Sequence, residues 1–312
     1  MKRANIPSWL LLAVAGLLPT NSLLCQQDVA SVHPIRVRAI LPPAGAQKGL
    51  EPSGLVLFKN RLLMVSDEKD IADIYELTEE NARTLQAVPF LSLSPIPGFT
   101  GEDLEGITSC GERIYVVDER THTVVEIGSD GKELAHPLEL PSVQVEADGT
   151  VPVENSGAGI EGIACDEAAG ILYVAQERQP RMIYSVDLSN FKIVDAFDVP
   201  AGWDSSRTDD GRLVYADYSD LYFESGFLYA LQRSDRTVLK IAPQKKQLVS
   251  KLRLDFQESQ YYDYTEPFGM AEGLYLTRER IYIVLDNNGA ARIGDAQDTS
   301  PLLLEFARPS DF

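Results

Sequence analysis

The chain has 312 residues, and its 47 aspartates and glutamates outnumber its 28 lysines and arginines, which gives a net charge of −19. A polyanion of this strength repels nucleic acids and anionic lipid surfaces, so the sequence predicts neither as a partner. No linker rich in Pro, Gly or Ser divides the chain after its first 25 residues, so we expect a single domain over residues 26–312.

Residues 1–25 have the pattern of a secretory signal peptide. Lys2 and Arg3 precede an apolar run from Trp9 to Leu18, and a polar stretch ends at Cys25. Cleavage after Cys25 predicts an exported protein, periplasmic or secreted. The alternative is a lipoprotein acylated at Cys25, although Leu24 stands where a small residue is expected. No other apolar run is long enough to span a bilayer, so we expect no transmembrane segment in the mature chain.

The first strand expected after this leader covers residues 34–41, where apolar and basic residues alternate. We expect it to pair with a strand near residues 302–306 and so to close a ring between the two ends of the chain.

Between these two strands the chain repeats one pattern five times: a short apolar strand, a turn, a second apolar strand and a charged residue. The copies begin at Ser53, Glu105, Glu161, Ser219 and Glu272, at intervals of 52, 56, 58 and 53 residues. Self-similarity at a near-fixed period, with short strands and turns as the unit, predicts the blades of a β-propeller.

The two strands of each copy suit two places in a blade. The first is rich in Gly, Ala, Ile and Leu, which fit the crowded innermost position, and the second is almost wholly apolar, as at residues 114–117, 172–175 and 281–285. We therefore expect an all-β fold, a propeller with five blades. A sixth, degenerate blade in the longer connections at 140–159 and 200–212 is the alternative.

Cys110 and Cys165 remain after cleavage, each near the end of the first strand of a repeat. In an exported protein they are compatible with a disulfide between neighbouring blades and equally with two buried thiols.

Charged residues recur at equivalent ends of the repeated hairpins. Antiparallel pairing brings the first residue of each copy next to the residue that follows its second strand, and the five pairs would then crowd one mouth of the central channel. These pairs are Ser53 with Glu68, Glu105 with Glu119, Glu161 with Glu177, Ser219 with Arg233, and Glu272 with Asp286.

So many carboxylates at short range require a compensating cation or raised pKa values. Oxygen ligands with no thiolate and no paired histidine favour Ca²⁺ over zinc, so we predict a Ca²⁺ ion on the propeller axis. The alternative is that some of these acids cap strand ends or pair with arginines as solvated salt bridges. The predicted metal ligands are Glu68, Glu105, Glu119, Glu161, Glu177, Glu272, Asp286 and Asn287.

Three arginines follow the second strands of consecutive copies: Arg120, Arg178 and Arg233. Beside a metal they would suit the anionic group of a phosphate ester, and the alternative is an Arg–Glu clasp between blades. The motifs of serine hydrolases, zinc proteases and P-loop enzymes are missing from the sequence.

The segments DLEGITSCGERIYVVDER, YSDLYFESGFLYALQR and MAEGLYLTRERIYIVLDNNG resemble successive motifs of the phytase-like family, which is described as having esterase-like activity of phytase. The resemblance covers roughly residues 50–289. More loosely the chain resembles the SdiA-regulated propellers related to NHL repeats, for which a calcium-binding five-bladed fold is known. Both resemblances imply an exported propeller that binds Ca²⁺, and the first also implies hydrolysis of an ester.

Two functional hypotheses follow. In the first, the protein is a monomeric Ca²⁺-dependent hydrolase of small-molecule carboxylic or phosphate esters, in which Glu105 or Glu161 acts as metal ligand or general base and Arg120, Arg178 and Arg233 hold the anionic group. In the second, the axial Ca²⁺ is structural and the propeller binds a small ligand or a protein partner without chemistry.

Overall fold

The structure is a computed structural model that describes residues 30–67, 72–93, 96–97, 99, 101, 103–140, 159–177, 181–199, 205–207, 213–215, 217–264 and 269–312. Almost all of its regular structure is β-strand, with two short 3₁₀ turns at Pro243–Lys245 and Glu258–Gln260. Within this part of the chain, no helix has the length and apolar character needed to cross a membrane.

The strands form antiparallel meanders in chain order. The first is β3 (Pro52–Phe58), β4 (Arg61–Ser66), β5 (Ile74–Asn81) and β6 (Thr84–Leu91). The second is β7 (Leu104–Cys110), β8 (Arg113–Asp118), β9 (Thr123–Ile127) and β10 (Glu133–Pro137). The third is β11 (Ile160–Asp166), β12 (Ile171–Gln176), β13 (Met182–Asp187) and β14 (Lys192–Phe197).

A short hairpin, β15 (Ser205–Arg207) with β16 (Leu213–Tyr215), makes a sheet of its own. The next meander is β17 (Asp220–Glu224), β18 (Phe227–Gln232), β19 (Thr237–Ala242) and β20 (Gln247–Leu254). The last begins with β21 (Ala271–Leu276), β22 (Arg280–Leu285) and β23 (Leu302–Ala307).

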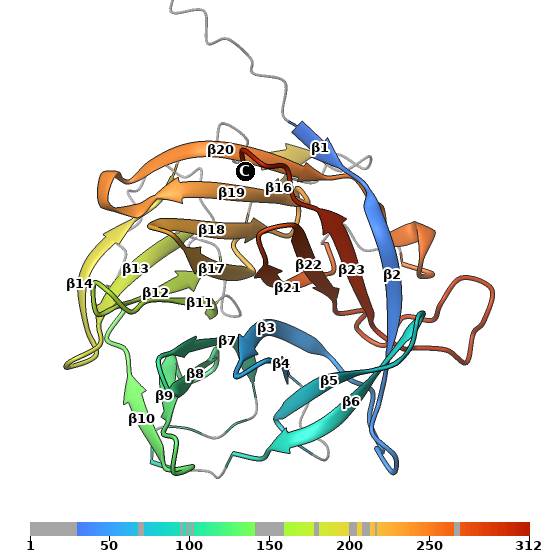
Figure 1. Ribbon diagram of the computed structural model, residues 1–312, viewed down its shortest axis with the longest axis horizontal. Coiled ribbons are helices and arrows are strands. Elements are labelled where there is room, and N and C mark those ends of the chain that lie inside the picture. Colours follow the sequence, from blue (N-terminus) through green and yellow to red (C-terminus); the bar gives the residue numbers. More distant parts are fainter. Residues whose placement is uncertain are drawn as a thin grey trace, which may run out of the picture.

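The first strand of each meander lies innermost, and β3, β7, β11, β17 and β21 follow one another around a closed cycle (Figure 1). The protein is therefore an all-β propeller, as its repeats predict. Five meanders are seen in the described residues, and the blade number of the whole chain stays a prediction.

The ring closes through the N-terminal strand β2 (Pro34–Leu41), which pairs antiparallel with β23, with Ala39 opposite Leu302. This confirms the predicted pairing of residues 34–41 with the C-terminal strand. β2 also runs parallel to β6, so the first and last meanders share one eight-stranded sheet. The strand β1 (Ala30–Val32), which the sequence does not predict, adds a parallel edge to β20.

The core lies between the sheets. Val116 of β8 packs toward the first meander, whereas Val117 packs toward the third, and neither is exposed to solvent. The second strand of the repeat is thus buried on both faces, which explains its unbroken apolar sequence. Each such fully buried side chain stabilises the fold by roughly 1.5–3 kcal/mol.

Four of the five innermost strands have a glycine at equivalent positions along the channel: Gly54, Gly106, Gly162 and Gly273. The remaining innermost strand, β17, has Asp220 at this position. A Cβ atom at Gly106 would collide with the backbone oxygen of Glu161, and one at Gly162 would lie 2.7 Å from the Cα of Asp220. The strands therefore touch backbone to backbone at this level. We refer to these five residues as the glycine girdle.

A disulfide joins Cys110 of β7 to Cys165 of β11, with their Cα atoms 5.8 Å apart. Of the two states that the sequence leaves open for these cysteines, the structure has the disulfide, and it links two neighbouring blades near the ends of their innermost strands.

Candidate functional site: an acidic mouth of the central channel

Four of the five innermost strands carry a β-bulge close to their first residues. The register shifts between Leu104 and Gly106 in β7, and the same irregularity occurs in β3, β11 and β21. A bulged residue drops out of the regular pairing and its side chain is re-aimed. The bulges contain Ser53, Glu105, Glu161 and Glu272, the residues at which four of the sequence repeats begin.

The partner of each bulged residue comes directly after the second strand. Glu119, Glu177, Arg233 and Asp286 follow β8, β12, β18 and β22, as expected. In the first meander this place belongs to Asp67, which directly follows β4, whereas the predicted ligand Glu68 lies outside the described residues. The sequence spacing could have identified Asp67, because Asp67 lies 14 residues after Ser53, just as Glu119 lies 14 residues after Glu105.

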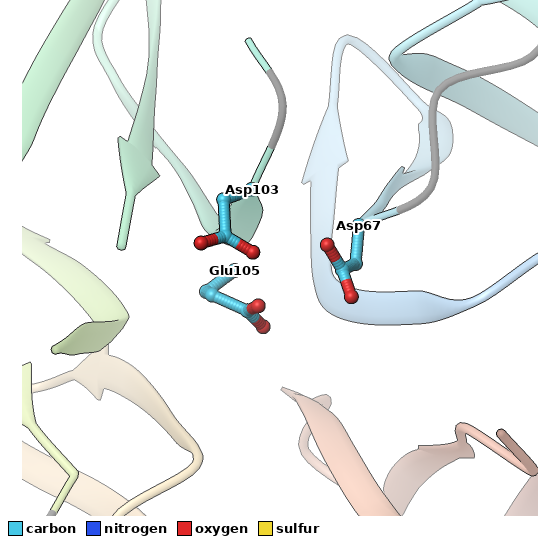
Figure 2. Close-up of side chains that lie close together, drawn as sticks. All are labelled: Asp67, Asp103 and Glu105. Atoms are coloured by element: carbon cyan, nitrogen blue, oxygen red, sulfur yellow. The ribbon is translucent and has the colours of Figure 1, made fainter. Parts of the chain in front are cut away.

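Three carboxylates from two neighbouring blades form one cluster: Asp67, Asp103 and Glu105, each with an oxygen within 4.8 Å of the others (Figure 2). Asp103 stands two residues before the bulge, a position that the repeat comparison does not single out. Glu51 and Asp217 occupy the same position in the copies that have Ser53 and Ser219 in place of glutamate. An acid two residues earlier thus takes the place of the missing glutamate.

A second cluster lies next to the first and consists of Glu119, Glu161 and Glu177, again within 4.8 Å of one another. The two clusters adjoin where the backbone N–H of Glu119 donates to the carbonyl oxygen of Asp103. In the second cluster the charges have partners in the protein. The backbone N–H of Gly159 donates to Glu119 Oε1 at 2.5 Å, and the guanidinium of Arg233 donates to Glu177 and lies 3.8 Å from Glu161.

Arg233 is the central cation of the mouth. Besides Glu177, its Nε donates to Asp217 Oδ2 at 3.0 Å and its Nη1 to Glu272 Oε1 at 2.5 Å. The carboxylates raise the pKa of this buried guanidinium well above its usual value, against the opposing effect of its burial. All three guanidinium nitrogens are therefore engaged with acids that come from three different blades.

The first cluster is electrostatically less compensated. Burial, with the charges of Asp103 and Glu51, raises the pKa of Asp67 to about 8. Burial and the neighbouring acids Asp67 and Glu272 raise the pKa of Glu105 well above the usual range. Arg120 approaches this cluster from the rim, with its Nε 3.5 Å from Asp103 Oδ2 and its side chain 59% exposed.

Of the remaining predicted residues, Asp286 and Asn287 follow the second strand of the last meander, and one lies outside the described residues. Burial, with the charges of Glu272 and Glu51, raises the pKa of Asp286 to about 7, although the N–H of Asn288 that it accepts acts to lower it. Asn287 is fully buried, and its Nδ2 donates to the carbonyl oxygens of Ala290 and Thr299, while its Oδ1 accepts no hydrogen bond from the described residues. Arg178 lies outside the described residues.

The donor set of the mouth fits a hard divalent cation. It offers carboxylate oxygens in two compact clusters, and the buried amide oxygen of Asn287 has no donor among the described residues. Ca²⁺ and Mg²⁺ take such ligands, whereas zinc prefers nitrogen and sulfur. His136 pairs with Glu126 and His33 with Asp255, and neither of these acids belongs to the two clusters.

Comparison with solved structures gives distant likenesses. The glutaminyl cyclase of Myxococcus xanthus superposes with a TM-score of 0.52 at 15% identity, over 90% of this chain and 100% of that one. A gluconolactonase of Xanthomonas campestris gives a TM-score of 0.46 at 13% identity, over 82% and 72% of the two chains. At this identity the first likeness bears on the fold alone.

Among curated proteins no sequence matches this chain significantly. A family model does match: the one described as SdiA-regulated covers residues 58–288, which is well over half of the chain and includes every residue of both acidic clusters. The propeller, its repeated hairpins and this match together place the protein: the chain belongs to the SdiA-regulated family.

Proposed function

We propose that the acidic mouth binds one Ca²⁺ ion, with Asp67, Asp103 and Glu105 as its central ligands. The observation that carries this proposal is the unequal compensation of the two clusters. Glu161 and Glu177 share the guanidinium of Arg233, whereas Asp67 and Glu105 face mainly other acids. A divalent cation bound by the first cluster would compensate its negative charge, as Arg233 compensates that of the second cluster.

Calcium suits this site better than magnesium. The ligands come from the ends of separate strands, so their geometry is irregular, and Ca²⁺ accepts six to eight oxygens in flexible arrangements while Mg²⁺ requires a near-octahedral site. Glu119, Glu161, Glu177, Glu272, Asp286 and Asn287 would surround the ion at greater distance. In this proposal the five acids among them set the negative potential that attracts it.

We further propose that the protein is exported and hydrolyses a small carboxylic or phosphate ester at this mouth. The disulfide supports export, because disulfides persist in oxidising compartments. The resemblance to the phytase-like family supports an ester substrate. The bound ion would polarise the carbonyl or phosphoryl oxygen.

The chain itself would supply the proton transfers and the substrate contacts. Burial and the nearby acids raise the pKa of Glu161, against the lowering effect of Arg233, and a carboxylate of raised basicity is suited to take a proton from the attacking water and return it to the departing alkoxide. The exposed guanidinium of Arg120 stands where it can bind an anionic group of the substrate. Arg178 remains a predicted second donor of this kind.

The second candidate function is a propeller whose ion is structural and whose mouth binds a ligand or partner without chemistry. The bonding of Arg233 favours it, because all three guanidinium nitrogens already lie on Asp217, Glu177 and Glu272. An arginine held in this way supports the fold and has little left to offer a substrate.

Calorimetric Ca²⁺ titration of the chelator-stripped protein tests the site, with p-nitrophenyl phosphate and p-nitrophenyl acetate turnover measured on the same samples. Asp103→Asn should weaken Ca²⁺ binding at least tenfold. Glu112→Gln, an exposed acid paired with Lys59 outside the mouth, should leave it unchanged. Binding with Ca²⁺-dependent turnover supports the hydrolase, binding without turnover supports the structural ion, and no binding refutes both.

The arginines separate the two functions further. Arg120→Met and Arg178→Met should each lower turnover while Ca²⁺ affinity stays within twofold, if the protein is a hydrolase. Unchanged turnover in both variants would remove the anion-binding role from these residues.

A further inference from the structure

The opposite end of the central channel opens into a cavity of about 290 Å³. Whereas the acidic mouth is built from the first residues of the innermost strands, this cavity is lined by their later residues. All five strands contribute: Val56 comes from β3, Ser109 from β7, Cys165 from β11, Phe223 from β17 and Tyr275 from β21.

The glycine girdle separates this cavity from the acidic mouth. At the level of Gly106 and Gly162 the neighbouring backbones are in contact. The one side chain of the girdle, Asp220, is fully buried, and its carboxylate accepts N–H groups from Leu221 at 2.7 Å and Leu274 at 2.6 Å. The buried side chain of Asp220 therefore lies between the acidic mouth and this cavity.

The side chains that line the cavity carry aromatic rings and hydroxyl groups, from Thr108, Ser109, Tyr222, Phe223 and Tyr275. Leu55, Ile107 and Leu221 also border it, but each is at most 3% exposed because its side chain packs into a core between two blades. None of the described residues that line the cavity has a side chain that is charged at neutral pH. A ligand that matches this lining is neutral, can stack on an aromatic ring and can form hydrogen bonds with hydroxyl groups.

The walls are held in place by contacts outside the cavity. Tyr275 stacks on Tyr282 behind it with ring centroids 5.8 Å apart and meets the edge of Tyr222 at 5.6 Å. Phe223 stacks on Tyr173 of the neighbouring blade at 5.7 Å. The Cys110–Cys165 disulfide ties two of the lining strands together at the rim. Binding would therefore cost little ordering of the site.

We propose that this cavity, here named the aromatic mouth, binds a small neutral molecule with one or two fused aromatic rings and a hydroxyl or N–H group. The ring would stack on Phe223 or Tyr275, and its polar group would reach the hydroxyls of the lining, among them those of Thr108 and Ser109.

Calorimetric titration with 2-naphthol tests this proposal, with D-glucose as the comparison. We expect 2-naphthol to bind with one-to-one stoichiometry and glucose not to bind. No binding of 2-naphthol would overturn the proposal, and glucose binding of equal or greater affinity would overturn the assigned ligand class.

Variants locate the site. Ser109→Phe fills the rim and should weaken 2-naphthol binding at least tenfold. Tyr275→Phe keeps the ring, removes the hydroxyl and should weaken binding about three- to tenfold, a loss of one hydrogen bond. This second variant keeps the test informative if Ser109→Phe does not fold. Tyr282→Phe, behind the wall, and Glu105→Gln, in the acidic mouth, should bind as the natural protein does. Equal weakening in Tyr282→Phe and Tyr275→Phe would place the ligand elsewhere.

Discussion

Arg233 determines the charge balance of the acidic mouth. In Arg233→Met the carboxylates of Asp217, Glu177 and Glu272 would stay buried without their cation. Removing one partner of a buried ion pair typically costs 3–5 kcal/mol, so we expect the free energy of unfolding in urea to fall by about that amount. Arg120→Met, at the exposed rim, should change it by less than about 0.5 kcal/mol. Similar effects of the two substitutions would argue against the central position of Arg233.

Asp67 gives the metal-free protein an unusual pH dependence. Its pKa rises from 3.8 in the unfolded chain to about 8 in the folded one, so the folded state holds a proton that the unfolded state releases. Between about pH 4 and pH 8 this residue therefore destabilises the fold increasingly as the pH rises. We expect the melting temperature in the presence of a chelator to fall across this range.

Two controls belong to this measurement. The fall of the melting temperature with rising pH should be smaller in Asp67→Asn, which has no carboxyl group to titrate at this position. Saturating Ca²⁺ should raise the melting temperature most at the alkaline end, where the carboxylates are ionised and bind the ion best. A melting temperature in chelator that is flat or rises between pH 5 and pH 8 would contradict the raised pKa.

For individual residues of the acidic mouth, the sequence predicts which acids lie in pairs but misses Asp67 and Asp103. Glu105 with Glu119 and Glu161 with Glu177 follow from hairpin symmetry, and the structure brings both pairs to one mouth. Asp67 is missed in favour of Glu68 because the first repeat contains two adjacent acids. Asp103 is missed because its position matters only once a bulge in β7 has redirected the chain.

Among the structural elements, the innermost strands depend on the glycine girdle. In Gly106→Ala the new methyl group would meet the backbone oxygen of Glu161, which no side-chain rotation can relieve. Overpacking of this kind costs typically 1–3 kcal/mol, so we expect a corresponding loss of unfolding free energy. Gly49→Ala is the matched control, since a Cβ there meets nothing within 4 Å. If Gly106→Ala is as stable as Gly49→Ala, β7 and β11 are not in contact at the girdle.

The repeated strands are predictable because their signal is local. An apolar run such as residues 114–117 is buried on both faces, and the structure places Val116 and Val117 against different neighbours. The state of Cys110 and Cys165 is not predictable in this way. It depends on the distance between two innermost strands of different blades, which local pattern does not contain.

For the whole molecule, closure of the ring can be predicted in part. The alternating pattern of residues 34–41 identifies a strand, and the C-terminal apolar run offers it a partner, which β2 and β23 confirm. The sequence of β1 is only Ala-Ser-Val and has no periodicity, so its parallel pairing with β20 is invisible before the fold is known. Together these two strands tie the N-terminal segment to three meanders, β1 to the fourth and β2 to the first and the last.

This double attachment predicts a graded response to truncation. A chain that starts at His33 lacks β1 and keeps β2, so it loses only a three-residue edge pairing and should melt a few degrees below a chain that starts at Ala30. A chain that starts at Pro42 also lacks β2, which leaves β23 and β6 with unpaired edges. It also lacks Ile40, a side chain with no solvent exposure in the fold, so the core around it is exposed to water. Exposed strand edges pair with other chains, so we expect this chain to aggregate or to unfold without cooperativity. Thermal unfolding and size-exclusion chromatography of the three chains check the series. Equal melting temperatures for all three would mean that the propeller closes without its N-terminal strands.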